Sequence, residues 1–576
     1  MNSEHDLIEK IKHYSNIIVY GAKIRGMVLL ERLNFHMSLF SNTDIFVAVT
    51  NTNGDKMYVG GVKRLDTLDG NEYFKKTGYL VKNIADLTHI SKSCVILIAA
   101  SPQYHEEMEK TAASLGFANI IRISESMHSE MTLRNDVFTT ARKIDELSYM
   151  EKYSQFLQYS VLNQIRLERL RDKIRHKKRI KIIFPIANTG HPNLFSVYRA
   201  LEGKNELFDC AFFCFDLYAD VELRKWTNDA FNHHLDAMRL FYNQLQTYNF
   251  NVIWGYDDNN NPIALETYSP DIIIHALAHL ILWDHLDAEQ HIKRIITKYL
   301  SCYIPYGMHV SNEFKYHFDH DGIYANWLHF IDTRQALDLC ANFAVTRGAN
   351  AVLAGHPQLD EYFEPLINIS KKIPQRPMVI YAPHWSVDTW HNTSTFHIHH
   401  RVFLELMKKY PDINFIFRPH KELGLEIYSN QKTKKTLSIS YEDYVDYRRT
   451  WAESPNGILE EDGSFINLFK QADCLITDCY SFITFWLPTD KPCMFLMNPE
   501  GPEDPYKYYY DFIHPVIDSY YICKTTEEIE KTFKDVVIDL NDPKAEQRRI
   551  QSKNLIYNLG HAGEFIADYI EKQLTD

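Results

Sequence analysis

Two short polar segments carry side chains that can bind phosphate groups. The first runs from Phe417 to Lys421 (FRPHK) and the second from Leu475 to Ser481 (LITDCYS). Mostly apolar residues at 413–417 and 474–476 lead into them and predict buried strands. Ligands of open α/β sheets bind at the carboxyl ends of strands. We therefore expect the two segments to meet in one anion-binding site.

The first segment supplies a cation and a ring that suit a diphosphate. Arg418 offers a planar fork for phosphate oxygens, and the rigid Pro419 sets the directions of Arg418 and His420. Lys421 adds a second positive charge. In the alternative interpretation, Arg418 pairs with a buried carboxylate.

The second segment can begin a helix that binds phosphate. Its unpaired N–H groups and the Ser481 hydroxyl would contact the phosphate, together with Thr477. Asp478 is expected as the helix cap or as an acceptor for a ribose hydroxyl. Helix capping alone would explain Asp478 or Ser481. The presence of a second polar segment with Arg418 and His420, also after a predicted strand, favours a donor site.

The elements that position these residues predict an α/β protein. We expect a Rossmann-like N-terminal domain at 1–130, a helical connector at 131–178, and two further Rossmann-like domains at 179–365 and 366–576 that face each other across a cleft. The connector follows from apolar spacings of three and four residues without Pro or Gly. Apolar runs predict the strands at 15–20, 45–50, 94–100, 180–185, 212–215, 252–254, 272–275, 302–305, 378–383, 413–417, 474–476 and 493–496.

The first domain departs from the dinucleotide-binding pattern. Gly21 to Gly26 follows a predicted strand, but Lys23 occupies the middle glycine position, where a side chain obstructs a pyrophosphate. Thr50 and Asn51 stand where a ribose-binding acid is expected. These features favour a binding or docking domain over a dehydrogenase.

Composition limits the classes of partner. The formal net charge of −13 argues against nucleic acid, whose binding needs a clustered basic surface. Nine cysteines without a C-x-x-C pair favour reduced thiols and a cytoplasmic protein. No apolar run is long enough to span a bilayer. The basic residues at 171–179 can rest on anionic lipid, which predicts peripheral contact with the inner face of the cell membrane, or can form a solvated helix end.

Several segments resemble those of the CDP-glycerol glycerophosphotransferases, the teichoic-acid polymerase family with a GT-B fold. Phe417 to Lys421 is similar to the family's Arg-Pro-His-Pro, Leu475 to Ser481 to Thr-Asp-Tyr-Ser-Ser, and Lys491-Pro492 to its Lys-Pro. Tyr381 to Ser386 (YAPHWS) looks like Tyr-Ala-Pro-Thr-Trp, and Gly355 to Asp360 (GHPQLD) resembles Gly-x-Pro-x-x-Asp. The likeness covers residues 180 to 570. It implies an acceptor domain at 179–365 and a nucleotide donor domain at 366–576.

The resemblance also implies roles for individual residues. His420 and Ser481 would bind the donor pyrophosphate, with Arg418 beside them. The family's Trp-His-Gly, whose His is its proposed base, appears here as Pro305-Tyr306-Gly307, so Gly307 joins the donor site and Tyr306 the catalytic position. A Tyr is a poor base near neutral pH.

Other histidines are candidates for the missing base. His384 is preferred because it follows a predicted strand in the cleft, and His309, His275 and His279 are alternatives. A histidine at a strand end also suits a phosphate ligand or a structural hydrogen bond.

Two further groups of residues were assigned from their positions. The loop after the strand at 180–185 places Thr189, His191 and Asn193 as acceptor-binding residues, or forms an ordinary turn. The histidines at 391–400 lack a familiar ligand spacing, so we expect no metal and no cofactor beyond the donor substrate.

The sequence therefore predicts a transferase that moves glycerol phosphate, or a related alditol phosphate, from a CDP-linked donor to a lipid-linked or glycan acceptor of teichoic-acid or capsule type. One alternative is a GT-B glycosyltransferase that uses a sugar nucleotide. Another is a noncatalytic nucleotide-binding scaffold.

Overall fold

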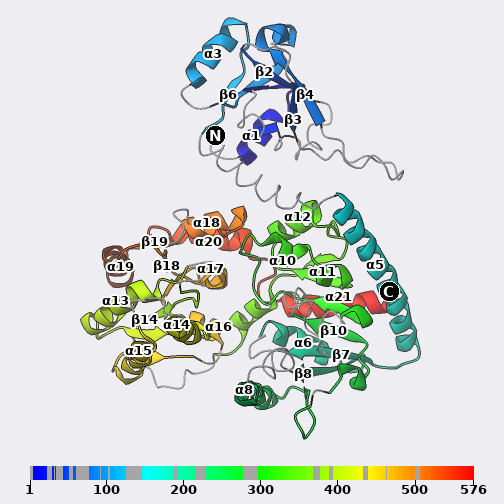
Figure 1. Ribbon diagram of the computed structural model, residues 1–576, viewed down its shortest axis with the longest axis vertical. Coiled ribbons are helices and arrows are strands. Elements are labelled where there is room, and N and C mark those ends of the chain that lie inside the picture. Colours follow the sequence, from blue (N-terminus) through cyan, green and yellow to red (C-terminus); the bar gives the residue numbers. More distant parts are fainter. Residues whose placement is uncertain are drawn as a thin grey trace. The chain divides into compact units, whose positions relative to one another are not determined.

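The computed structural model shows an α/β protein built on three mostly parallel sheets (Figure 1). Contacts divide the chain into two compact units, residues 1–143 and 144–576, and each is described by itself. The structure describes residues 4–21, 29–30, 33, 43–50, 56–59, 77–90, 93–100, 104–124, 146–186, 192–215, 228–261, 263–276, 296–366, 376–387, 393–432, 439–461, 464–499 and 506–576.

The first unit contains a six-stranded sheet of order β3-β4-β2-β1-β5-β6, in which the β3–β4 pair is antiparallel. Gly21 ends β1 with φ +131°, and a Cβ there would lie 2.5 Å from the Ala99 carbonyl oxygen, so only glycine fits. Lys23 lies outside the described residues. The elements are α1 (Glu4–Ile11), β1 (Asn16–Tyr20), β2 (Asp44–Val49), β3 (Lys56–Val59), β4 (Thr77–Asn83), β5 (Cys94–Ile98), α3 (His105–Ser114) and β6 (Ile120–Arg122).

The second unit contains two parallel sheets. The first has the order β13-β12-β11-β10-β7-β8-β9. Its strands are β7 (Ile180–Ile186), β8 (Phe208–Cys214), β9 (Val252–Trp254), β10 (Ile272–His275), β11 (Leu300–Tyr303), β12 (Leu328–Ile331) and β13 (Ala351–Leu353). Its helices are α5 (Glu146–Arg175), α6 (Phe195–Glu202), α8 (Asn228–Thr247), α10 (Phe314–Phe318), α11 (Asp321–Ala325) and α12 (Arg334–Phe343).

The second of these sheets has the order β16-β15-β14-β17-β18-β19. Its strands are β14 (Met378–Ala382), β15 (Asn414–Phe417), β16 (Gly457–Leu459), β17 (Cys474–Thr477), β18 (Cys493–Leu496) and β19 (Tyr521–Cys523). The helices are α13 (Phe396–Lys409), α14 (Leu423–Lys432), α15 (Tyr441–Glu453), α16 (Phe465–Gln471), α17 (Tyr480–Trp486), α18 (His514–Asp518), α19 (Thr526–Phe533), α20 (Ala545–Leu555) and α21 (Ala562–Thr575).

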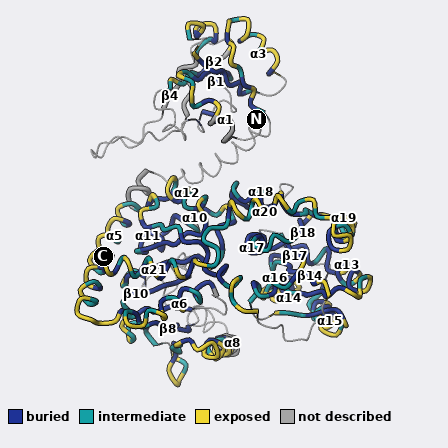
Figure 2. Tube along the Cα trace, turned by 180° about the vertical axis from the view of Figure 1, so that it is seen from behind, coloured by how far each residue is buried: buried dark blue, intermediate teal, exposed yellow. Residues whose placement is uncertain are grey.

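Both sheets of the second unit are buried on their two faces (Figure 2). In β7, Ile182 and Phe184 pack into one core and Ile183 into another, as expected for a parallel strand covered on both sides. This pair of Rossmann-like domains confirms the predicted GT-B-like fold class.

The described part of the predicted connector consists mainly of α5, and this helix packs on the second unit; residues 131–145 lie outside the described residues. In α5, Leu167 and Leu170 enter the core of the first sheet of that unit, and the Asn163 side chain donates to the Ala325 carbonyl at 3.0 Å. The predicted lipid-facing basic residues are partly engaged within the protein, because Arg171 donates to the Gln573 carbonyl and Lys173 pairs with Asp271.

After the roles that the resemblance implies, we refer to the part of the second unit built on β7 to β13 as the acceptor half and to the part built on β14 to β19 as the donor half. The C-terminal helix α21 packs on α6 of the acceptor half (Figure 1). The predicted Gly355-to-Asp360 motif holds this crossing in place. Gly355 has φ +87°, and a Cβ there would lie 2.4 Å from the Tyr557 carbonyl oxygen. The Asp360 carboxylate accepts the N–H groups of Ala562 and Gly563 at 3.0 and 2.7 Å.

Candidate functional site

The strand order of the donor half reverses between β14 and β17. The predicted phosphate-binding segments lie at the ends of β17 and of β15, the neighbour of β14. His384 comes two residues after β14, and Ser481 comes four residues after β17. His420 follows the neighbouring strand β15. Such a reversal is the place where open α/β sheets bind ligands, at the carboxyl edge.

The structure brings the side chains of these segments together. The His384 ring centroid lies 5.5 Å from that of His420 and 5.6 Å from that of Tyr480. The backbone supports the arrangement, since the His420 N–H donates to the Pro383 carbonyl at 3.1 Å. The His384, His420 and Tyr480 side chains therefore form one cluster, and Ser481 adjoins Tyr480 in the chain. We call these four residues the histidine pocket.

Nδ1 of both histidines accepts a backbone N–H, and at His384 the Ser386 hydroxyl also lies 2.8 Å from Nδ1. The Ser386 N–H donates to His384 Nδ1 at 3.3 Å, and the Glu422 N–H donates to His420 Nδ1 at 3.2 Å. A nitrogen that accepts a hydrogen bond carries no proton, so each neutral ring carries its proton on Nε2. Desolvation and, to a smaller extent, the positive charge of Lys421 lower the pKa of His420 to about 4. His420 is thus a neutral N–H donor near pH 7, and His384 has the same tautomer, which suits a phosphate ligand better than a base.

Asp478 and Thr477 hold the loops of the pocket instead of facing a ligand. The fully buried Asp478 carboxylate accepts the N–H groups of His384 and Thr395, both at 2.5 Å, and the Thr395 hydroxyl at 2.8 Å. Thr477 is also buried, and its hydroxyl donates to the Ala382 carbonyl at 2.6 Å. The structure corrects the expectation for Asp478, because the N-cap of α17 is Cys479 and the carboxylate is inaccessible to a ribose.

The side chains of Arg418 and Ser481 differ in how available they are to an anion. The Arg418 guanidinium lies 4.0 Å from the Glu460 carboxylate, which matches the alternative in which Arg418 pairs with an acid. The Ser481 hydroxyl is half-buried and lies 3.5 Å from the Cys479 sulfur.

A cavity of about 550 Å³ opens beside His420 and Lys421. Tyrosine rings of α14 and α15 form much of its wall, and the Tyr428 and Tyr441 rings lie edge to face with centroids 5.3 Å apart. Arg448 and Glu461 form an ion pair at its rim. The lining residues are His420, Lys421, Gly424, Leu425, Tyr428, Tyr441, Tyr444, Arg448 and Glu461. Neither the aromatic wall nor its continuity with His420 was predicted, because the wall depends on the packing of α14, which begins at Leu423, against α15, which begins at Tyr441.

The acceptor half meets the donor half next to the histidine pocket. Residues 310–312 pair with 508–510: the Tyr510 N–H donates to the Val310 carbonyl and the Asn312 N–H to the Tyr508 carbonyl, both at 3.0 Å. The Tyr480 ring packs on Tyr509, with centroids 5.2 Å apart. The turn that contains Tyr306 and Gly307, just before residue 310, is therefore near the pocket.

Tyr306 is poorly suited to accept a proton. Its side chain is 60% exposed, yet surrounding protein raises its pKa by desolvation, and the charges of Glu313 and Cys479 raise it further. A Cβ at Gly307 would meet no atom within 4 Å, so open space adjoins this glycine.

His309 lies beneath the surface of the acceptor half. Its ring is 2% exposed in a cluster of histidines, and Nδ1 donates to Asp332 at 2.6 Å. Burial alone would raise the pKa of Asp332, but His309 brings it down to about 2. Because the ring is enclosed, the structure argues against His309 as a base that reaches a substrate.

The predicted acceptor residues fall into two groups. Thr189 and His191 lie outside the described residues. Asn193 is buried, and its amide donates to the Pro305 carbonyl at 2.9 Å, so it supports the turn before Tyr306 instead of facing an acceptor. Of the histidines considered for a metal, His399 and His400 make separate hydrogen bonds to Lys524 and Phe396 carbonyls.

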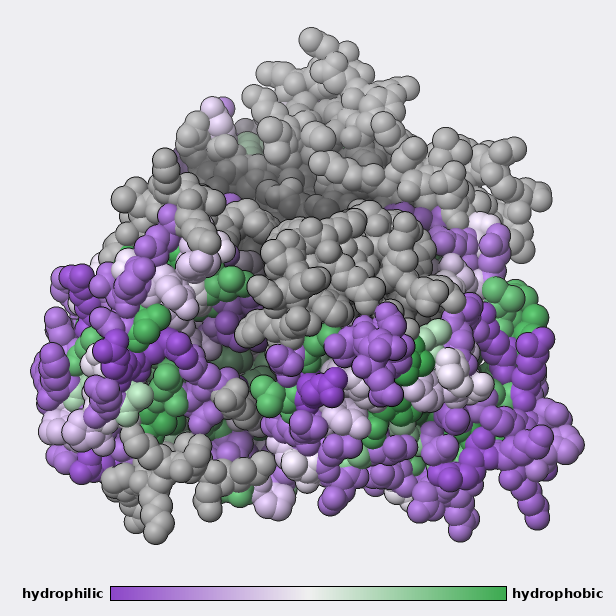
Figure 3. All heavy atoms as spheres, turned by 60° about the horizontal axis from the view of Figure 1, so that its bottom comes forward, coloured by the Kyte–Doolittle hydropathy of each residue, from purple (hydrophilic) through white to green (hydrophobic). Residues whose placement is uncertain are grey.

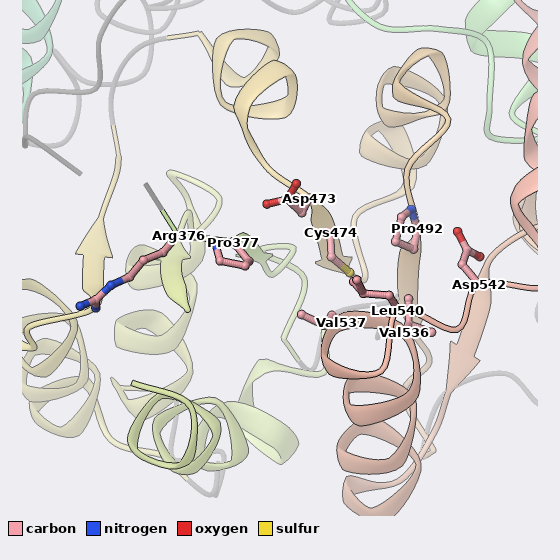
Figure 4. Close-up of a pocket in the computed structure, with 9 residues that line it drawn as sticks. All are labelled: Arg376, Pro377, Asp473, Cys474, Pro492, Val536, Val537, Leu540 and Asp542. Atoms are coloured by element: carbon pink, nitrogen blue, oxygen red, sulfur yellow. The ribbon is translucent and has the colours of Figure 1, made fainter. Parts of the chain in front are cut away.

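A second cavity, of about 630 Å³, lies at the opposite edge of the donor sheet (Figure 4). Pro377, Asp473 and Pro492 line it, and each precedes a strand. The Asp473 carboxylate accepts a hydrogen bond from the Met378 N–H at 2.8 Å. This amino edge is not where parallel sheets bind ligands.

Comparison with known proteins gives structural likenesses at low identity. No family model matches the chain, and no curated protein matches its sequence. Among solved structures, the wall teichoic acid polymerase TagF is 12% identical, with a TM-score of 0.45 over 75% of this chain and 98% of TagF. The UDP-GlcNAc 2-epimerase of Neisseria meningitidis, bound to UDP-GlcNAc, is 12% identical, with a TM-score of 0.39 over 69% of this chain and 99% of the epimerase. S. aureus MnaA with UDP is also 12% identical, with a TM-score of 0.40 over 69% and 97%.

Proposed function

We propose that this protein is a transferase that binds a nucleoside diphosphate donor in the histidine pocket. The observation that carries the proposal is the convergence of His384 and His420 at the strand reversal of the donor sheet, each with its Nε2–H as a donor. Together with the Ser481 hydroxyl and Lys421, these groups can bind several oxygens of a diphosphate.

The cavity beside His420 is the proposed site of the nucleoside. It is continuous with His420 and Lys421, so a diphosphate in the histidine pocket would direct its nucleoside there. Tyrosine faces can stack on a base, and the Arg448–Glu461 pair offers donors and acceptors to its edge.

The proposed reaction is transfer of glycerol phosphate, or a related alditol phosphate, from a CDP-linked donor to a cell-surface glycan or teichoic-acid-like precursor. The sequence segments that resemble the glycerophosphotransferases support this choice of donor. A sugar-nucleotide glycosyltransferase is the second candidate, since contacts to phosphate do not identify the group that the phosphate carries.

A lipid-linked acceptor would require contact with a membrane surface. No described helix combines the length and apolarity needed to cross a bilayer. Figure 3 shows a face on which the described residues are mainly hydrophilic, with scattered hydrophobic patches. The exposed Lys177 and Lys178 at the end of α5 are the residues we propose for contact with anionic headgroups.

Thermal-shift measurements with CDP-glycerol, CDP-ribitol, CMP and UDP-GlcNAc test the donor site. A ligand that binds only the native state stabilises it by about 2.7 kcal/mol at 100 times its Kd. We expect CDP-glycerol or CDP-ribitol to raise the unfolding temperature most. The variant His420→Ala should lose most of that shift, because it removes a direct phosphate contact.

His176→Ala is the matched control, since His176 is exposed at the end of α5. It should keep the full shift. A strong shift with UDP-GlcNAc alone would favour the glycosyltransferase. The donor site would be refuted by a shift of equal size in His420→Ala and the native protein, or by no shift with any nucleotide.

A further inference from the structure

Any transfer to an acceptor hydroxyl requires a group that takes the hydroxyl proton, and the predicted bases that the structure describes do not fill this role. Among them, His275 is fully buried and hydrogen-bonded to Asn326, whereas His279 lies outside the described residues. Backbone N–H groups occupy Nδ1 of both His384 and His420, so each presents a protonated nitrogen. His309 is enclosed. The pKa of Tyr306 is raised. The other described residues near the histidine pocket are therefore candidates for the proton acceptor.

Glu313 places a carboxylate at this point of the acceptor half. It follows the 310–312 segment, which pairs with 508–510 of the donor half. Tyr508 and Tyr509 of that segment pack on Tyr480 of the histidine pocket, with ring centroids 6.1 and 5.2 Å apart. Glu313 is thus connected to the pocket through the pairing of 310–312 with 508–510 and the packing of that segment on Tyr480.

The surroundings of Glu313 leave its carboxylate available. The side chain is half-buried, and among the described residues its hydrogen-bond donor is the Ser311 hydroxyl, at a long 3.4 Å. No lysine or arginine of the described chain forms an ion pair with it. Carboxylates with shifted pKa values cluster at functional sites, so a half-buried carboxylate without a cation is a candidate for a functional role.

The electrostatics of Glu313 also suit proton transfer. Desolvation raises the pKa of Glu313, and the Ser311 hydroxyl offsets only part of this effect. A base with a pKa closer to the working pH accepts a proton more effectively. The charge of Glu313 raises the pKa of Tyr306 and contributes to the raised pKa of Tyr510, so the carboxylate lies within electrostatic range of both rings.

We propose that Glu313 is the general base that removes the proton from the acceptor hydroxyl. This assignment rests on the proposed transferase function. The acceptor oxygen forms a bond to the phosphorus that carries the glycerol, and the bond from that phosphorus to the bridging oxygen breaks. The electron pair leaves with CMP, which His384 and His420 hold, and the proton passes from the hydroxyl to the Glu313 carboxylate and then to solvent. With a sugar nucleotide, the acceptor would attack the anomeric carbon and the proton would take the same path.

The variant Glu313→Gln tests the proposal, since it keeps the shape of the side chain and removes its basicity. The assay measures CMP release from CDP-glycerol with glycerol as a minimal acceptor, and UMP or UDP release from UDP-GlcNAc in parallel. We expect kcat to fall by about 100-fold or more, the usual contribution of a general base. The thermal shift with the same nucleotide should stay unchanged, because Glu313 does not contact the donor phosphates.

A pH profile and a conservative variant separate catalysis from support of the fold. In the native protein, kcat should rise with pH as Glu313 ionises, and Glu313→Gln should lose this acid limb. Tyr306 and Tyr510, the titratable rings within range, have raised pKa values and do not titrate there. Glu313→Asp should restore part of the rate. Glu405→Gln, an exposed change on α13, should match the native protein throughout.

The other outcomes would contradict either the role of Glu313 as the base or the donor site itself. Equal turnover in Glu313→Gln and the native protein would overturn the base. Nucleotide binding by the native protein without release of product from any of these donors would do the same. Absence of nucleotide binding by the native protein would instead overturn the proposed donor site, and the base with it.

Discussion

The Asp478 carboxylate positions the histidine pocket without contacting a ligand itself. Its three hydrogen bonds join the loop after β17 to the loop after β14 and to the start of α13. Burial raises the pKa of Asp478 to about 6, although the N–H groups of Thr395 and His384 act against the increase. The geometry of His384 therefore depends on this buried acid.

Asp478→Asn should weaken nucleotide binding and lower the free energy of unfolding by about 1–3 kcal/mol, because an amide cannot accept all of these donors and leaves buried groups unpaired. Asp473→Asn is a matched control at the other edge of the same sheet, where the acid accepts the Met378 N–H. The control should lose stability and keep nucleotide affinity. Both properties can be measured by urea unfolding and calorimetric titration. Normal affinity in a folded Asp478→Asn protein would contradict this role.

At this scale, the sequence predicted which residues meet but not what each one does. His420 and Ser481 could be predicted because both follow apolar strands. The burial of Asp478 could not, since it depends on Thr395, a residue far away in the chain. Glu313 has no motif and no apolar strand directly before it, so its position near the donor half followed only from the pairing of 310–312 with 508–510.

Among the elements, α21 ties the C-terminus to the acceptor half. Ile566, Ile570 and Leu574 enter the core of that half, and Asp360 satisfies the first N–H groups of the helix. A carboxylate near a helix N-terminus is favourable because it meets unpaired N–H groups.

Asp360→Ala should lower the free energy of unfolding by about 0.5–2 kcal/mol, the usual cost of losing a helix cap. Asp360→Asn keeps one acceptor oxygen and should lose less. Urea unfolding of residues 144–576 measures both variants. A stability of Asp360→Ala equal to that of the native protein would show that the cap contributes nothing.

The strength of the apolar pattern decided which strands could be predicted. The predicted ranges 252–254, 272–275 and 493–496 match β9, β10 and β18. The edge strands β13, β16 and β19 were missed, because their apolar residues do not stand out from the surrounding chain. β12 was missed because His329 interrupts it.

The whole molecule divides after residue 143, and α5 belongs to the second unit. A fragment of residues 144–576 should therefore fold and show the same nucleotide-induced thermal shift as the full chain. A fragment of residues 179–576 should be unstable, because it lacks Leu167 and Leu170 of the core. Circular dichroism and thermal unfolding of the two fragments measure the difference. Equal stability would contradict the assignment of α5.

The central claim is that one pocket of the donor half binds a nucleoside diphosphate. A crystal structure of the protein with CDP tests it most directly. We expect phosphate oxygens within about 3.2 Å of Nε2 of His384 and His420, the range of a hydrogen bond, with the cytidine in the cavity lined by Tyr428 and Tyr441. A diphosphate bound elsewhere, such as the cavity beside Arg376, or an empty histidine pocket at saturating CDP, would contradict the account.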